Sequence, residues 1–384
     1  MTASEKILQK ALAASNIDSK RWNEIQAGLR DRAFFSSKVE SARVLHAARE
    51  LSAQVASGDL SLSDFRLKMR HALYLDNYDP GDRRGTIQDL LTEKRLDLIA
   101  KTNVAQARGY VQHLQATNEG ALLAYPCYEL VRVAQRKQPR DWAARWRDAG
   151  GRFFGGRMIA TKTDPIWTRI SAFGNPFPPF DWGSGMGLDE VDYAEAVKLG
   201  VIERGQKIEP PKIDFNGKLE ATVPFKGHGD PEWQWLKDAF GDQVVYKGDA
   251  ILWKGEIMQG VARGEGSVRL GKSTDRLLSH FSGLDREHLE NTSLSITGEW
   301  VEQHASKHIG ENEKDKRNIP LTPGDFELIP SLWRNPDSVI PGNYPGSSVL
   351  TMETFDGGIL NLAIDHRSGA MPLSFFKQKM SAGR

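Results

Sequence analysis

The sequence predicts a multidomain α+β protein with a helical N-terminal region, an irregular Trp/Gly/Pro-rich middle and a small antiparallel α+β C-terminal domain. Three observations predict this order. Apolar residues recur at helical spacing in the first third of the chain, tryptophans and glycines concentrate in residues 125–200, and three strand-like segments joined by tight turns end the chain. We divide the chain into residues 1–122, 123–205, 206–265 (a connector with a short helix) and 266–384.

Composition limits the functions that the whole chain can have. The 384 residues are enough for two or three domains, and the net charge of +1 provides no broad attraction for nucleic acid or an anionic membrane. Any such binding therefore needs a local patch. The single cysteine, Cys127, excludes an internal disulfide and a multi-cysteine zinc site. Because no apolar run reaches about 18 residues, we expect no membrane partner.

The N-terminal region shows helical periodicity. Residues 38–56 place four apolar side chains on one helical face: Val44, Ala48, Leu51 and Val55. Ser61 is positioned to cap the next helix, with Asp64 three residues further on. The segment 78–85, YDPGDRRG, breaks the pattern with a Pro-Gly turn, and a longer helical stretch is expected from about residue 86 to 118.

The middle of the chain is unlike a helical bundle. Its large aromatic rings and many glycines predict short strands and turns, and its tryptophans are Trp142, Trp146, Trp167 and Trp182. In the run NPFPPFDWGSGMG, prolines fix φ and glycines permit tight turns, which predicts a rigid shaped loop. This stretch contains no convergent Ser/His/Asp or Cys/His set. We interpret Asp181 as a turn or capping group rather than as a catalytic acid.

Basic residues cluster just before and within this segment, interleaved with aromatic rings. Phosphate contact and base stacking are one function that this pattern suits. The resulting candidates for binding a partner or nucleic acid are Arg136, Lys137, Arg140, Trp142, Arg145, Trp146, Phe180, Asp181 and Trp182. Two alternatives stay open: a solvated face whose arginine stems cover apolar surface, and a patch that docks on an acidic partner.

The remainder of the chain predicts a connector and then a small α+β unit. Residues 210–229 have the composition of an extended connector, whose exposed loop is a natural site for proteolytic nicking, and Pro231 starts a short helix. The charged run 311–317 is expected to be a solvated loop. Residues 347–355, 357–366 and 369–377 are expected to form three antiparallel strands.

The octapeptide GSVRLGKS, residues 266–273, matches the phosphate-binding loop pattern G-x-x-x-x-G-K-[ST]. A working loop of this type follows a buried strand, but the preceding residues MQGVARGE are polar and broken by glycines. The downstream strands are joined by hairpin turns and so predict an antiparallel sheet. We interpret the match as chance, and keep a nucleotide-binding packaging factor as the weakest of three functional hypotheses.

Residues 40–202 resemble the phage head morphogenesis proteins, the Mu F-like minor head proteins. The resemblance rests on PRDW at 139–142, DPIW at 164–167, FGNPFPPFDWGSGM at 173–186 and the helix that follows. It implies a protein that binds portal or major capsid subunits during virion assembly, with packaged DNA as a further partner. It also implies a location in the host cytoplasm during assembly and then in the virion, in the head or portal region.

Residues 272–384 resemble the barnase–EndoU–colicin–RelE nuclease group, which cleaves RNA without metal by means of a general base, a general acid and a cation. The resemblance implies five catalytic candidates: His308 or His304 as the acid/base, Lys377 or Arg334 as the phosphate cation, and Ser374 as an orienting hydroxyl. No metal or cofactor is expected, because HASKH lacks the glutamate of H-E-x-x-H. An RNase toxin on a phage-head scaffold is thus the second hypothesis, beside an inert remnant or a binding module.

Overall fold

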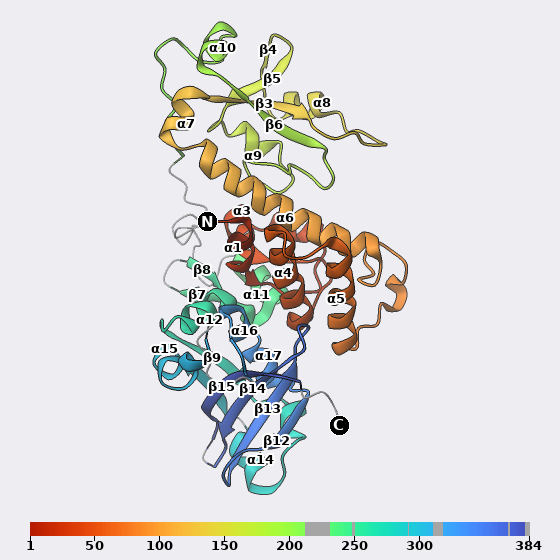
Figure 1. Cartoon of the computed structure of the whole chain (residues 1–384), viewed down its shortest axis with the longest axis vertical. Coiled ribbons are helices and arrows are strands. Elements are labelled where there is room, and N and C mark those ends of the chain that lie inside the picture. Colours follow the sequence, from red (N-terminus) through yellow and green to blue (C-terminus); the bar gives the residue numbers. More distant parts are fainter. Residues whose placement is uncertain (212–230, 248–249, 291, 310–317, 368, 381–384) are drawn as a thin grey trace.

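The structure, a computed structural model, describes residues 1–211, 231–247, 250–290, 292–309, 318–367 and 369–380. It is a mixed α+β fold, as the sequence predicts, and it is elongated, with three tiers (Figure 1). The middle segment forms one end, the N-terminal helices the centre, and the C-terminal sheet the other end. The expected connector at 210–229 falls almost wholly outside the described residues, and the charged run 311–317 lies wholly outside them.

The central tier is helical. Its helices are α1 (Ala3–Leu8), α2 (Ser19–Glu24), α3 (Ala27–Asp31), α4 (Ala42–Ser57), α5 (Leu62–Leu75), the 3₁₀ turn η1 (Gly81–Arg83), α6 (Glu93–Ala116) and α7 (Glu119–Ala124). Strands β1 (Ala11–Leu12) and β2 (Ala33–Phe34) pair in parallel. The predicted cap of α5 is confirmed, because the backbone N–H of Asp64 donates to Ser61 Oγ at 3.1 Å.

Helix α6 starts later than the periodicity predicts. The segment before it forms turns that Asp89 holds by accepting hydrogen bonds from the backbone N–H groups of Gly85 (2.8 Å) and Leu91 (2.9 Å). Thr92 then caps the helix, whose backbone N–H at Arg95 donates to the Thr92 hydroxyl. Because the Asp89 side chain binds backbone N–H groups in turns, α6 begins at Glu93 rather than near residue 86.

The middle segment forms a compact module on one side of α6 (Figure 1). Its antiparallel sheet has the order β4-β5-β3-β6, made of β4 (Phe153–Phe154), β5 (Arg157–Thr161), β3 (Cys127–Arg132) and β6 (Met186–Val191). Short helices complete it: α8 (Trp142–Asp148), α9 (Ile166–Arg169) and α10 (Tyr193–Lys198). The prediction of short strands packed around aromatic rings is confirmed, since the rings of Trp146 and Trp167 lie 5.3 Å apart in a buried core.

The C-terminal tier is built on an antiparallel sheet of order β11-β15-β14-β13-β12, composed of β11 (Asn318–Ile319), β15 (Met371–Lys379), β14 (Gly358–Asp365), β13 (Ser347–Glu353) and β12 (Ser338–Pro341). The three predicted strands correspond to β13, β14 and β15, and their antiparallel pairing is confirmed. Two further antiparallel pairs accompany them: β7 (Val244–Lys247) with β8 (Ala250–Trp253), and β9 (Ser267–Lys272) with β10 (Ser293–Thr297).

The second half of the chain also contains short helices: α11 (Pro231–Phe240), α12 (Lys254–Ala262), α13 (Asp275–Leu278), α14 (Gly283–Leu289), α15 (Gly298–Trp300), α16 (Pro323–Phe326) and α17 (Ile329–Arg334). Irregular turns η3 (Gly241–Gln243), η4 (Val301–Ala305) and η5 (Ser306–His308) join them. Helix α11 confirms the predicted helix that begins at Pro231. Within the residues described, no helix combines the length and apolar character needed to cross a membrane.

The N-terminal helices and the C-terminal unit share one continuous hydrophobic core. Leu45 and Leu51 of α4 belong to the same buried cluster as Leu332 of α17 and Leu350 of β13. The fully buried Arg49 guanidinium forms an ion pair with Glu327, between α16 and α17. Residues far apart in the sequence therefore stabilise each other. The division of the chain into four segments stays a prediction.

Candidate functional site

The loop that carries the FGNPFPPFDWGSGM motif is held between two helices of the central tier. Gly109 of α6 lies so close to this loop that an added Cβ would overlap the Pro178 carbonyl oxygen. At the other side Gly174 has φ +70°, and a Cβ there would lie 3.0 Å from Ala27 of α3. The loop is therefore fixed against α3 and α6 by close backbone approach, and two surfaces of the molecule include its residues.

Asp181 organises this loop, as the turn interpretation predicts. Its Oδ1 accepts a hydrogen bond from the backbone N–H of Trp182 at 2.7 Å, and its Oδ2 lies 2.8 Å from Arg145 Nη1 and 3.5 Å from Arg140 Nε. Arg140 also donates to the Trp182 carbonyl at 3.0 Å. Asp181 is therefore a structural anchor that two of the predicted arginines share.

Three of the predicted binding residues are core residues, and this part of the prediction is wrong. Trp146 and Phe180 are completely buried and Trp142 is 3% exposed, so their rings cannot reach a partner. The Arg145 guanidinium lies over the Trp142 ring, 4.8 Å from its centroid, and covers it from solvent. Spacing alone did not separate rings that fill the module's core from rings at its surface.

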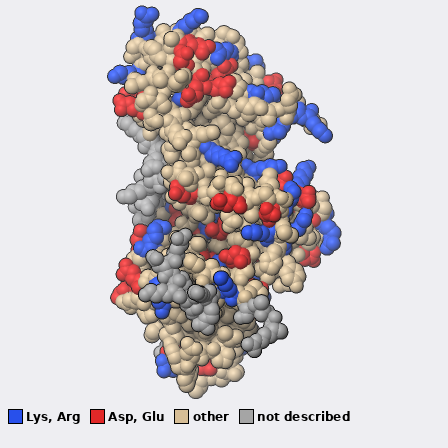
Figure 2. Space-filling model, in the orientation of Figure 1, with Lys and Arg blue, Asp and Glu red and all other residues tan. Residues whose placement is uncertain are grey.

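Of the predicted basic residues, Arg136 lines a groove along one face of α6. Exposed cations at a spacing of seven residues, Lys94, Lys101 and Arg108, line it on the α6 side, and Arg136 lines it from the module. The groove has a volume of about 750 Å³. Figure 2 shows Lys and Arg side chains gathered near this junction of module and helix. Lys137 is exposed beside Arg136.

The acidic residues of the groove neutralise its positive charge only in part. Asp97 is shared between Lys101, at 2.8 Å, and Arg66, at 2.9 Å, while Asp181 is bound to arginines of the module. Arg136 donates its Nε to the Gly183 carbonyl at 2.7 Å, which orients the side chain without cancelling its charge. The groove is thus a local positive surface on a chain whose total charge is close to zero.

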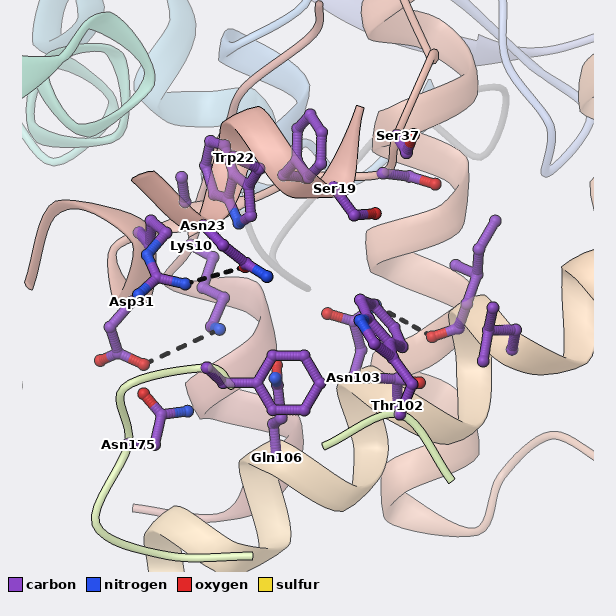
Figure 3. Close-up of a pocket in the computed structure, with 18 of the residues that line it drawn as sticks. Lys10, Ser19, Trp22, Asn23, Asp31, Ser37, Thr102, Asn103, Gln106 and Asn175 are labelled. Carbon is purple, nitrogen blue, oxygen red and sulfur yellow. Dashed lines mark hydrogen bonds and ion pairs between the residues drawn. The ribbon is translucent and has the colours of Figure 1, made fainter. Parts of the chain in front are cut away.

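A second positive site lies on the adjacent side of α6 and is shown in Figure 3. We call it the anion pocket. It is lined by Lys10 after α1, Arg30 and Asp31 of α3, and Arg95 of α6. The motif loop completes it with three side chains: Phe173, Asn175 and Trp182. Leu98 and Thr102 of α6 line both the anion pocket and the groove, so the two sites are neighbours.

The anion pocket holds more buried positive charge than it neutralises. Among the described residues that line it, Asp31 alone carries a carboxylate, and its Oδ2 already accepts a hydrogen bond from Lys6 at 2.6 Å. Burial lowers the pKa of Lys10 to about 8, although Asp31 counteracts it, and burial lowers the pKa of Arg30 to about 10. Both shifts express the cost of holding a cation away from water.

Two guanidinium nitrogens in this pocket have unused hydrogen-bonding capacity. Arg95 donates its Nη2 to Ser36 Oγ and to the Ser37 carbonyl, each at 2.9 Å, while Arg30 donates its Nη1 to Asn23 at 3.0 Å. Within the part of the chain that the structure describes, the buried Nε of each arginine has no acceptor. An unpaired buried donor on a charged group is costly. Because each Nε is itself buried from solvent, what suits this pocket to an anion is the positive charge of the two guanidinium groups rather than a contact from Nε.

The dimensions and walls of the anion pocket define what it can bind. Its volume is about 80 Å³, whereas one water needs about 10–15 Å³ by this measure, so the pocket admits one phosphate-sized anion. Aromatic rings form part of the wall: Trp22 stacks on Phe35 at 4.2 Å, and Phe173 meets Trp182 edge-on at 4.9 Å. This combination suits a phosphate that carries a planar or sugar-like group toward solvent.

The five predicted catalytic residues of the C-terminal unit do not form one site as the prediction requires. The helix expected to present His304 and His308 on one face is interrupted, because Ala305 has φ −119° after the π turn. His304 is exposed and stacks on Trp300, with ring centroids 5.9 Å apart. His308 is buried against Phe376 at 5.8 Å, so the two histidines have different neighbours.

The predicted phosphate cations already bind carboxylates. Lys377 is 4% exposed, and its Nζ lies 3.2 Å from Asp325 and 2.7 Å from Asp356. Burial opposes the charged form, but the two carboxylates outweigh it and raise the pKa of Lys377. Arg334 forms an ion pair with Asp242. Both cations are therefore internal ion-pair members rather than free phosphate ligands.

Ser374 is half-buried in β15, three residues before Lys377. In a strand this spacing places the two side chains on opposite faces of the sheet. Ser374 and Lys377 therefore do not face one phosphate together, and the alternative with Arg334 as the cation stays a prediction.

The segment 266–273 has the wrong conformation for a phosphate-binding loop. Residues 267–272 form strand β9, paired antiparallel with β10, and the next helix, α13, has four residues. A phosphate-binding loop needs successive backbone N–H groups that converge on one anion, whereas β9 directs its own into a ladder. The interpretation of this match as chance agrees with the structure.

The described residues contain no group of three or more His, Cys, Asp or Glu side chains arranged to hold a metal ion. No protein-family model, curated protein or solved structure matches this chain. The anion pocket was not predicted from the sequence, because Lys10, Arg30 and Arg95 are spread over 85 residues and each looks like an ordinary surface residue in isolation.

Proposed function

We propose that this chain is a phage or prophage minor head protein that binds portal or capsid subunits during virion assembly and contacts the packaged DNA through the groove and the anion pocket. One observation carries the DNA contact. The segment that resembles head morphogenesis proteins supplies Phe173, Asn175 and Trp182 to the anion pocket, and Arg136 and Pro178 to the groove. The motif residues and the two positive sites thus belong to one arrangement.

The chemistry of these two sites suits a nucleic-acid backbone. Flexible exposed cations along α6 provide contacts to phosphates without reading sequence, which is what a packaging or portal-associated protein requires. Lys94, Lys101 and Arg108 recur at seven-residue intervals, and about 1.5 Å of rise per residue separates neighbours by roughly 10 Å. The anion pocket then offers one enclosed position for a phosphate beside the groove.

The test of the head-protein proposal is the composition of the particle. Particles from cells that carry the parent genome are purified on a density gradient, and peptides from both ends of the chain are scored by mass spectrometry. Full-length protein at a constant ratio to portal is the expected result. Absence from complete particles, together with no binding of the purified protein to portal or capsid, would contradict the proposal.

The RNase hypothesis for residues 272–384 is a separate proposal, supported by the resemblance alone. Purified full-length protein would be incubated with RNA, with a His308→Ala variant of matched thermal stability as comparison. Cleavage that is lost in the variant would support an appended nuclease. No RNA cleavage by the wild-type protein would contradict the nuclease proposal. The nucleotide-binding packaging factor is not proposed further, because β9 occupies its motif.

A further inference from the structure

Three side chains from three elements converge at the far end of the C-terminal sheet. Ser348 Oγ of β13 lies 3.0 Å from His366 Nε2, and His366 Nδ1 lies 3.1 Å from Asp285 Oδ1 of α14. His366 directly follows β14. The order Ser–His–Asp, with one imidazole nitrogen for each neighbour, is the arrangement of a nucleophile, a general base and an orienting carboxylate.

The fold explains why these residues meet. Ser348 pairs with Ile364 across the β13–β14 ladder, so His366, two residues later, lies on the same face of the sheet as Ser348. The His366 backbone N–H donates to the Gly346 carbonyl at 2.9 Å, and the Phe281 ring meets the imidazole edge-on at 5.3 Å. The backbone hydrogen bond and the contact with the Phe281 ring thus hold the imidazole in place.

The hydrogen bonds define the roles of the two imidazole nitrogens. A carboxylate accepts only, so Nδ1 carries the proton and donates it to Asp285. Nε2 is then the acceptor for the Ser348 hydroxyl. His366 is 3% exposed, whereas the Asp285 side chain is 52% exposed at the rim. Asp285 therefore orients the imidazole from the rim, and burial shields the imidazole from bulk water. Both conditions suit a general base that activates a hydroxyl.

The same three side chains line a cleft of about 540 Å³. Its other walls are the β12–β13 turn and the start of α14, including Phe281, Ile340 and Tyr344. Among the described residues of this lining there is no lysine or arginine. A polyanion such as RNA needs cations at its phosphates, so this cleft fits an uncharged substrate with an apolar part.

We propose that Ser348, His366 and Asp285 form the catalytic site of a serine hydrolase that acts on uncharged carboxylic esters. Ser348 Oγ attacks the ester carbonyl carbon while His366 Nε2 takes the hydroxyl proton. The imidazolium then gives this proton to the departing alkoxide, which leaves as the alcohol. Water attacks the acyl-serine, His366 accepts the water proton and returns it to Ser348 Oγ, and the carboxylic acid is released. Ester and water become acid and alcohol, with no other reactant.

The experiment uses the full-length protein and two probes. The first is a fluorophosphonate, which phosphonylates an activated serine and is mapped by mass spectrometry of the adduct. The second is a set of p-nitrophenyl esters from acetate to octanoate. We expect a single adduct on Ser348 and ester hydrolysis that S348A and H366A abolish. D285N is expected to lower kcat by at least about 100-fold, because the histidine loses its orienting carboxylate.

Ser338→Ala is the matched control, since Ser338 is an exposed serine of β12 in the same sheet. It is expected to keep both labelling and hydrolysis. Adduct mapping on the wild type does not depend on any variant's fold. No adduct and no hydrolysis by the wild-type protein would overturn the proposal, as would labelling that persists in S348A. RNA cleavage that needs His366 but not Ser348 would also overturn it and assign the histidine to a nuclease.

Discussion

Neutralising the groove cations changes how salt affects DNA binding, and the structure predicts by how much. The variant carries Lys94→Gln, Lys101→Gln, Arg108→Gln and Arg136→Gln, which removes the exposed cations that line the groove. Each phosphate contact contributes about 0.9 to the slope of log K against log salt. Four contacts give about 3.6, so between about 50 and 200 mM salt the wild type loses roughly 150-fold more affinity than the variant.

The assay is fluorescence anisotropy of a labelled DNA duplex titrated with protein at four salt concentrations. The control variant removes the same number of charges from exposed positions away from the groove: Lys20→Gln, Lys68→Gln, Lys198→Gln and Arg204→Gln. Its slope is expected to stay within about 0.9 of the wild type, the contribution of one contact. Equal slopes for the groove variant and the wild type would refute the groove as a DNA site, and so would an equal loss in the control.

Three further predictions concern stability. Burial lowers the pKa of Lys10 to about 8, so the unfolded state binds more protons than the folded state between about pH 8 and 10.5. The free energy of unfolding, measured with urea, should therefore rise by up to about 3 kcal/mol across this pH range. Lys10→Met should remove the rise. Lys377→Met leaves the buried Asp325 and its neighbour Asp356 without their cation, and should lower the free energy of unfolding in urea by about 3–5 kcal/mol. A decrease below about 1 kcal/mol would mean that the lysine is free for another role. Gly109→Ala should lower the midpoint of thermal unfolding, because the added Cβ separates the motif loop from α6. Gly58→Ala is the comparison, since its Cβ position is open and only its positive φ opposes the substitution. Equal decreases for the two variants would argue against the close approach of the loop to α6.

Local chemistry was predictable from the sequence. The Ser61 cap, the start of α11 at Pro231 and the hairpin order of β13, β14 and β15 are each decided by a few neighbouring residues, and all are confirmed. The delayed start of α6 is the informative exception. Its periodicity continued through residues 86–92, but Asp89 diverted the backbone N–H groups into turns.

The sites were less predictable because they are assembled from distant segments. Trp146 and Trp182 look alike in sequence, yet one fills the core of the module and the other lies at the anion pocket. His304 and His308 satisfied a helical spacing that the break at Ala305 removes. His366 is not predicted by any local pattern, since its partner Asp285 precedes it by 81 residues.

The shared core of the two chain ends has a consequence for synthesis. The backbone N–H of Leu12 donates to Glu327 Oε2 at 2.8 Å, across a separation of 315 residues. At a synthesis rate of about 5–20 residues per second, β1 and α4 wait roughly 15–60 s on the ribosome for the residues that complete their core. During that interval α1, α5 and α6 already pack on α4, but the apolar surface that meets the C-terminal unit is uncovered, so the nascent chain needs a chaperone or an early partner more than the finished protein does.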